Sequence, residues 1–142
     1  MVWGRVRGGF GVGFLWQGRR QLEGTKALTI VFKQLKAIFE WYNAWFLSED
    51  FNGCMFQKAL EEVIKIYPST LEPATQYKIW LTALVQRLLT QLGIQNPTHL
   101  ATLIVSILDG MTIQAHVNRH SVEMDQYWTR VEHLINYEKA LA

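Results

Sequence analysis

Apolar residues recur every three or four positions along most of this chain, which is the spacing of helices that bury one face. The pattern begins near Thr25 and is interrupted at short polar segments, and the three prolines of the chain, at positions 68, 73 and 97, all lie between the apolar stretches. Proline begins or ends helices and rarely continues them. The chain is therefore predicted to be all-α, an antiparallel helical bundle of five or six helices.

Turn and cap signals place the helix boundaries. Asn52 is a suitable N-cap, and Asn96-Pro97 fits an N-cap followed by the first helical position. Gly93 marks a helix C-terminus, because glycine accepts the left-handed conformation that ends many helices. The expected helices are those at 26–47, 53–66, 70–92 and 97–117, and a fifth that opens at Ser121.

Glycine and charge set the first 25 residues apart from the rest. Residues 1–25 hold seven of the ten glycines and have a net charge of +3, which predicts a flexible Gly/Arg-rich arm. Residues 26–142 form the predicted helical domain, with ten basic and eleven acidic side chains. Nucleic-acid-binding domains usually show a clustered basic face. No nucleic acid contact is therefore expected of this chain itself.

The cysteine content and the hydropathy of the chain indicate the cellular compartment in which the protein is expected. Cys54 is the only cysteine, which excludes an internal disulfide and a cysteine zinc site and fits the reducing cytoplasm. The longest apolar candidate, Ile94 to Leu108, contains the polar run 95–99, so no membrane span is expected. The prediction is a cytoplasmic protein without membrane contact.

Two small motifs give weak signals for chemistry. His116, His120 and Glu123 have a spacing that suits a metal on one continuous helix, but residues 118–121 have the composition of a turn. Cys54 near a helix start favours a reactive thiol, yet no local His or Asp partner is implied. We expect no metal and no cofactor.

The carboxylates argue against an enzyme. The acids nearest to apolar faces form no obvious catalytic pair. These acids are Glu40, Glu61, Glu62 and Asp109.

Three segments resemble the C-terminal regulatory domain of the tetracycline-repressor (TetR) family of bacterial transcription regulators. They are Trp41 to Leu47, Asn52 to Val63, and the aliphatic-Asp-Gly helix Leu108 to Ala115. The likeness covers roughly residues 26–138. The helix-turn-helix domain of that family has no counterpart in this chain, so the resemblance implies contact with DNA only through a missing N-terminal domain.

The resemblance implies a domain that binds a small apolar effector and forms a homodimer. Shape and dispersion would provide most of the binding in an apolar cavity between the first four helices, with Cys54 and Gln114 as polar or polarisable points. The predicted lining is Phe39, Tyr42, Phe46, Cys54, Met55, Tyr77, Leu81, Leu84, Met111 and Gln114.

The last two helices carry apolar residues beyond those that one face needs, so residues 96–138 are predicted to pair with a second subunit. Gly110, a glycine inside a helix, suggests close helix approach there. The predicted dimerisation residues are Leu103, Ile107, Gly110, Ile113, Val117, Trp128, Val131 and Ile135.

The main alternative is a helical dimerisation module that has no ligand. In that case the same aromatic and aliphatic side chains fill the interior at ordinary core density.

Overall fold

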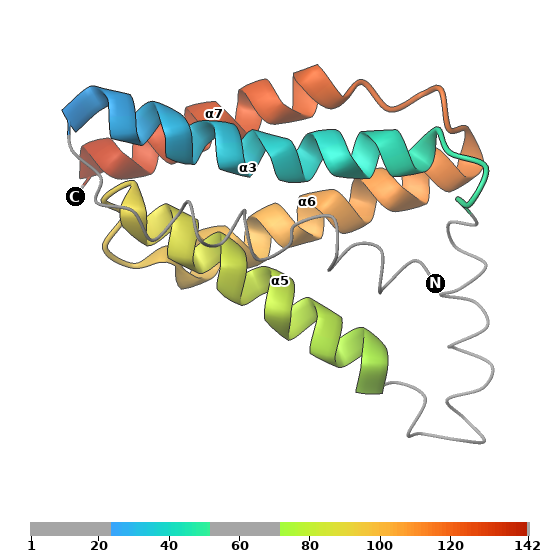
Figure 1. The fold of residues 1–142 in the computed structure, drawn as a ribbon, viewed down its shortest axis with the longest axis horizontal. Coiled ribbons are helices and arrows are strands. Elements are labelled where there is room, and N and C mark those ends of the chain that lie inside the picture. The colour runs from blue at the N-terminus through green and yellow to red at the C-terminus, as the bar shows by residue number, and fades with distance from the viewer. Residues whose placement is uncertain (1–23, 52–71, 142) are drawn as a thin grey trace.

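The computed structural model describes residues 24–51 and 72–141, and these residues form helices and short turns (Figure 1). The described residues contain no strand, so the all-α prediction is confirmed. The helices are α3 (Gly24–Phe46), α5 (Glu72–Gln91), α6 (Pro97–Val117) and α7 (Met124–Leu141). The predicted helix at 53–66 and most of the predicted arm at 1–25 lie outside the described residues, so the count of five or six helices remains a prediction.

Successive described helices run in opposite directions (Figure 1). α3 packs against each of the other three, and α5 packs most extensively against α6. Toward its amino end, α5 diverges from α3 (Figure 1). The described helices therefore form an antiparallel arrangement, and α3 and α5 are closest near the carboxyl end of α5.

The helix boundaries follow the sequence signals closely at two places. Gly93 has a φ of 94°, the left-handed conformation that glycine adopts without a steric cost. Its N–H donates to the Thr90 carbonyl at 3.0 Å, and the Ile94 N–H donates to the Leu89 carbonyl at 3.2 Å. These two bonds are those of a Schellman motif, which satisfies the last carbonyls of a helix.

Pro97 is the first residue of α6, as predicted, because its missing N–H has no helical partner at that position. Asn96 occupies the N-cap, but its side chain makes no capping hydrogen bond.

The last helix begins three residues later than predicted. Ser121 was expected to open it, but the Ser121 N–H and hydroxyl both donate to the Asn118 carbonyl, at 2.9 and 2.7 Å. The first backbone bonds of α7 instead go from the Gln126 and Tyr127 N–H groups to the Glu123 carbonyl. The Ser121 hydroxyl therefore bonds within the turn and does not cap the helix.

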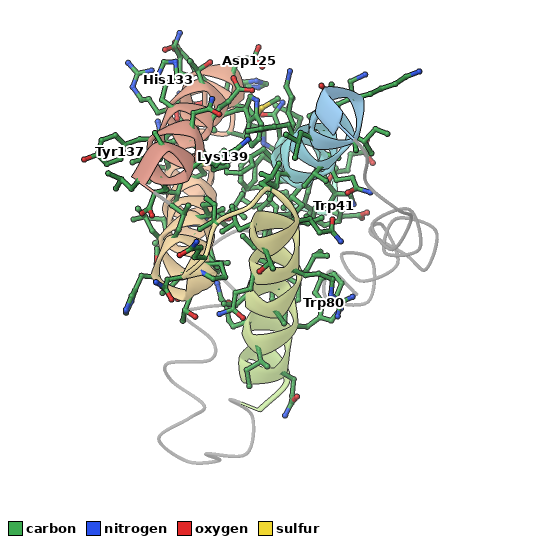
Figure 2. All side chains as sticks on the ribbon, turned by 90° about the vertical axis from the view of Figure 1, so that its left-hand side faces the viewer. Trp41, Trp80, Asp125, His133, Tyr137 and Lys139 are labelled. Carbon is green, nitrogen blue, oxygen red and sulfur yellow. The ribbon has the colours of Figure 1, made fainter. Side chains whose placement is uncertain are left out.

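The core lies between α3 and the other helices. α3 contributes a buried face with helical spacing, and the α3 ring of Phe39 meets the α7 ring of Trp128 at a centroid distance of 5.5 Å. At the other end of α7, the Lys139 ammonium lies 5.7 Å from the centroid of the Phe32 ring (Figure 2). The large buried apolar residues of α3 are Val31, Leu35, Ile38, Phe39, Tyr42 and Phe46.

α6 is the one helix of the described residues that is long and apolar enough to cross a membrane by length and composition, with a mean hydropathy of 1.4. Like α3, it packs against each of the other described helices. A core helix of a soluble protein meets the same criterion, so this is weak evidence for a membrane span. Leu103, Ile113 and Val117 of α6 are exposed and lie outside its buried face, so α6 carries apolar residues on more than one face.

Candidate functional site

The predicted pocket residues that the structure describes gather in one core. Phe39, Phe46, Leu81 and Met111 are completely buried, and Tyr42, Tyr77 and Leu84 are nearly so. All seven belong to the same hydrophobic cluster. Cys54 and Met55 lie outside the described residues.

Tyr42 of α3 and Tyr77 of α5 are joined at their ends by a hydrogen bond. The two hydroxyl oxygens are 2.5 Å apart, and either can be the donor. Both side chains are at least 96% excluded from solvent, so the bond lies inside the apolar core. Phenol rings are long, which allows the pair to connect two helices whose axes diverge. The pair is a polar point in the middle of the predicted effector site.

Burial determines the protonation state of this pair. Loss of hydration raises the pKa of Tyr42 well above its ordinary value, and the neighbouring Tyr77 raises it further. Burial also raises the pKa of Tyr77, although the hydrogen bond with Tyr42 acts in the opposite direction. The Asp109 carboxylate contributes to both upward shifts. Both phenols are therefore neutral at physiological pH and can donate or accept a hydrogen bond.

Asp109, which belongs to the aliphatic-Asp-Gly segment, has a structural partner. Its carboxylate forms an ion pair with the Lys78 ammonium and thereby links α6 to α5. Both side chains are more than one third exposed. Such partly exposed pairs contribute little to stability.

An aromatic cluster surrounds the carboxyl end of α3. The Trp45 ring meets the Phe51 ring edge-on at a centroid distance of 4.8 Å, and it also contacts Trp41, Tyr42 and Phe46. The Trp45 Nε1–H is buried and has no acceptor among the described residues. Trp45 lies in the segment Trp41 to Leu47 that carries the family resemblance, but sequence reasoning did not distinguish it as a possible donor to a ligand.

Gln114, predicted as a polar contact for the effector, connects α6 to the turn and to α7. Its Oε1 accepts a hydrogen bond from the Tyr127 hydroxyl at 2.5 Å, and its Nε2 donates to the Ser121 carbonyl at 3.2 Å. In the same turn, Arg119 Nη1 donates to the Ser48 carbonyl at 3.2 Å. These bonds hold the α6–α7 turn against the end of α3.

The histidine spacing falls across a helix end. His116 lies in the last turn of α6, which ends at Val117, and His120 lies in the following turn. The two side chains therefore do not share one continuous helix. Among the described residues, no group of three or more His, Cys, Asp or Glu side chains has the arrangement to hold a metal ion.

The predicted dimerisation residues fall into two groups. Leu103, Ile113 and Val117 expose 45%, 47% and 82% of their surface, Gly110 is exposed, and Ile107 is half-buried. All five lie on α6. The α7 members of the set belong to the core of the protomer itself, because they pack under α3; these are Trp128, Val131 and Ile135.

α7 nevertheless carries its own exposed apolar side chains, which sequence reasoning did not single out. They are Tyr137 and Leu141, exposed by 63% and 68%. Tyr137 points away from α3 and α5, at the edge of the molecule that α6 and α7 share (Figure 2). The signal that was available is their helical spacing: Tyr137 lies three residues after Leu134 and Leu141 lies seven after it, on a face opposite to the one that contains Trp128.

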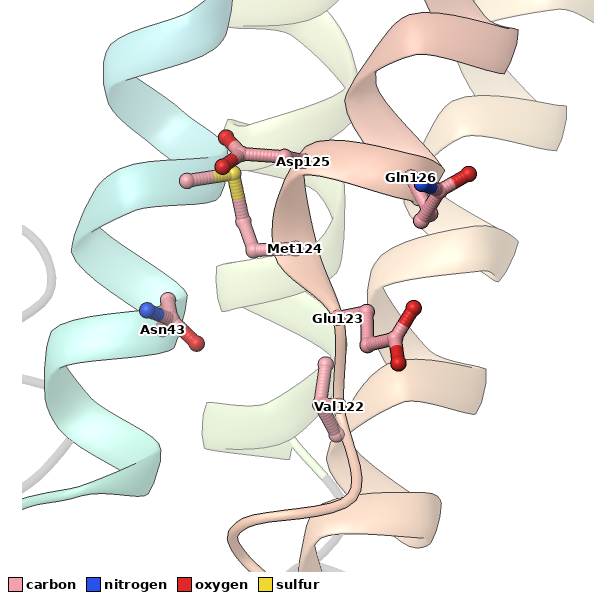
Figure 3. A pocket seen from close by; sticks show the side chains of 6 residues that line it. All are labelled: Asn43, Val122, Glu123, Met124, Asp125 and Gln126. Carbon is pink, nitrogen blue, oxygen red and sulfur yellow. The ribbon is translucent and has the colours of Figure 1, made fainter.

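A hollow of about 410 Å³ lies where Asn43 of α3 faces the start of α7 (Figure 3). Its other lining residues form the segment 122–126, which includes the Glu123 and Asp125 carboxylates. Acidic side chains at a helix amino end are favourable to the helix itself. The hollow is open to solvent, and we assign no ligand to it.

No protein-family model matches this chain, and no match was found among curated proteins or among solved structures.

Proposed function

We propose that this chain is the effector-binding and dimerisation domain of a bacterial TetR-like transcription regulator, which senses a small apolar molecule. The observation that carries the proposal is that α6 has two apolar faces, one in the core and the other exposed. A helix that is apolar on all sides is normally buried on all sides. A second copy of the chain provides that burial, as in a four-helix bundle made from two helix pairs.

The effector part of the proposal is supported by the chemistry around the tyrosine pair. Small-molecule sites are mostly apolar and have a few polar groups that orient the ligand. Tyr42 and Tyr77 supply neutral hydroxyls in an apolar surrounding, and Trp45 supplies a buried N–H without an acceptor in the described part of the chain. An effector that carries one carbonyl or hydroxyl oxygen matches these donors.

Thermal unfolding tests the effector part. Small hydrophobic compounds with one carbonyl or hydroxyl group, such as simple aromatic ketones and alcohols, are screened for an increase in Tm. A ligand that binds only the folded state raises Tm by mass action. The replacement Leu84→Trp should abolish the increase, because its larger ring fills the site, whereas Ala83→Leu on the exposed side of α5 should preserve it. An absence of any Tm increase across the panel contradicts the effector part.

The second candidate is a dimerisation module without a ligand. It is favoured by the complete burial of Phe39, Phe46, Leu81 and Met111, which is what ordinary core packing produces. Both candidates predict a dimer, so sedimentation at micromolar concentration tests what they share. The ligand screen then distinguishes one from the other.

A further inference from the structure

We infer that the dimer of this protein is built on an antiparallel contact between α6 and the α6 of a second copy, with the two-fold axis passing beside Gly110. The inference rests on the proposed dimerisation and specifies its geometry. It follows from the order of residues on the exposed face of α6, from the environment of Gly110 and from the charge of the helix.

The apolar residues on the outer side of α6, of which Ile107 is half-buried and the others are exposed, are arranged symmetrically about Gly110. Ile107 and Ile113 lie three positions before and after it, and Leu103 and Val117 lie seven positions before and after it. Positions three and seven apart fall on one side of a helix. In an antiparallel pair related by a two-fold axis at position 110, each residue meets the residue equally far on the other side. Leu103 then meets the partner's Val117, and Ile107 meets the partner's Ile113.

Gly110 has no role within the protomer that requires a glycine. A Cβ added there would meet no atom of the described residues within 4 Å, and its φ lies outside the left-handed region. Glycine inside a helix is nevertheless destabilising relative to alanine. The residue is exposed at the centre of the apolar face, where a missing side chain lets a second helix approach closely.

The charge of α6 also suits a second copy. Asp109 is the only acidic or basic residue among positions 97–117 apart from the histidines, and its carboxylate is paired with Lys78 of α5. Two copies of this face therefore meet without opposing like charges. Depletion of charge is typical of the centre of a protein interface.

α7 extends the same surface. It lies beside α6 at one edge of the molecule, and Tyr137 points outward from that edge (Figure 2). With α6 paired antiparallel at the centre, Tyr137 and Leu141 of each copy flank the contact and add apolar area. Two copies thus assemble a bundle of four helices.

Spin labels on single cysteines test the position of the axis. In a Cys54→Ser background, labels are placed in separate proteins at Leu103→Cys and at Val117→Cys, and the distance between the two subunits is measured by pulsed electron paramagnetic resonance. Because each site lies seven residues from Gly110, the two sites should give equal distances, with a component of about 21 Å along the helix. A label at Ile79→Cys on the exposed side of α5 serves as the control and should give a longer distance.

The possible outcomes separate the alternatives. Two short distances of roughly 10 Å indicate parallel helices, and two long distances indicate an interface elsewhere. A short distance at one site with a long one at the other places the axis away from Gly110. Each of these results overturns the geometry while dimerisation stands. A wild-type protein that sediments as a monomer overturns dimerisation itself.

Substitutions of Gly110 provide a second test that does not depend on labels. Gly110→Leu should raise the dissociation constant of the dimer at least tenfold, whereas Ala83→Leu should leave it unchanged. Gly110→Ala should raise the denaturation midpoint of the monomer, at protein concentrations below the dissociation constant, and should weaken the dimer. A Gly110→Ala protein whose dimer is as tight as wild type or tighter overturns the proposed axis.

Discussion

The hydroxyls of Tyr42 and Tyr77 meet in the core at 2.5 Å, and this contact joins α3 to α5 across 35 residues of sequence. Removal of one hydroxyl leaves the other buried without this partner. We expect Tyr42→Phe to lower the free energy of unfolding by about 1–3 kcal/mol.

The double variant Tyr42→Phe/Tyr77→Phe should cost less than the sum of the single changes, because it removes both polar groups together. Urea denaturation measures all three variants. Tyr137→Phe, which changes an exposed phenol, is the matched control and should be close to neutral. Additive effects of the two single changes would show that the hydroxyls are not coupled.

The raised pKa values of the same two phenols predict a loss of stability at alkaline pH. In the unfolded chain a tyrosine titrates near pH 10, whereas burial keeps Tyr42 and Tyr77 protonated in the folded protein. The unfolded state therefore releases protons first as the pH rises. The stabilising contribution is complete below about pH 10 and decreases above it. Comparison of wild type with the double phenylalanine variant between about pH 8 and pH 11 isolates this effect from other titrations.

If the wild-type free energy of unfolding falls no more steeply than that of the double variant over this range, the phenols are not shielded as described.

Trp128 is expected to matter to the protomer and not directly to the dimer contact. Its ring packs on Phe39 in the core, so Trp128→Ala should lower the free energy of unfolding by about 3–5 kcal/mol. Val117→Ala, on the exposed face of α6, should change the stability of the monomer by about 0.5 kcal/mol or less. Denaturation at a low protein concentration, at which the monomer predominates, compares the two. A small cost for Trp128→Ala would mean that α7 is not anchored through this ring.

The hydrogen bond from Tyr127 to Gln114 should contribute to the docking of α7. Tyr127→Phe removes the hydroxyl and retains the ring, and we expect a loss of about 0.5–1.5 kcal/mol in the free energy of unfolding. Thr129→Ala is a suitable control, because the Thr129 hydroxyl donates to the Asp125 carbonyl of its own helix and, among the described residues, forms no bond to another helix. If the two variants lose the same free energy of unfolding, the bond from Tyr127 to Gln114 makes no measurable contribution to the docking of α7.

Gly93→Ala should be destabilising by about 1–3 kcal/mol, because a side chain is strained at a φ of 94° even where space is open. Thermal or urea unfolding measures the cost. A neutral effect would indicate that the end of α5 adjusts to a different conformation.

The sequence alone predicted the features that depend on neighbouring residues. Gly93 and Pro97 mark helix boundaries through their own backbone properties, so the carboxyl end of α5 and the start of α6 were predicted to within about two residues. The apolar spacing of α3 also determined its buried face, because that face follows from helix geometry. The start of α7 was predicted incorrectly because a serine hydroxyl can either cap a helix N-terminus or bond within a turn. In the folded chain the Ser121 hydroxyl donates to the Asn118 carbonyl of the turn.

Only the tertiary structure decided which apolar face meets which neighbour. Trp128 and Tyr137 are both large aromatic residues of α7. Trp128 packs against Phe39 and is buried, whereas Tyr137 lies on the opposite side of the helix and is exposed. Gln114 was predicted to face an effector, but Tyr127 and Ser121 lie within its reach in the folded chain. Periodicity shows that a helix has an apolar side, whereas contacts between distant segments depend on how the helices are placed in space.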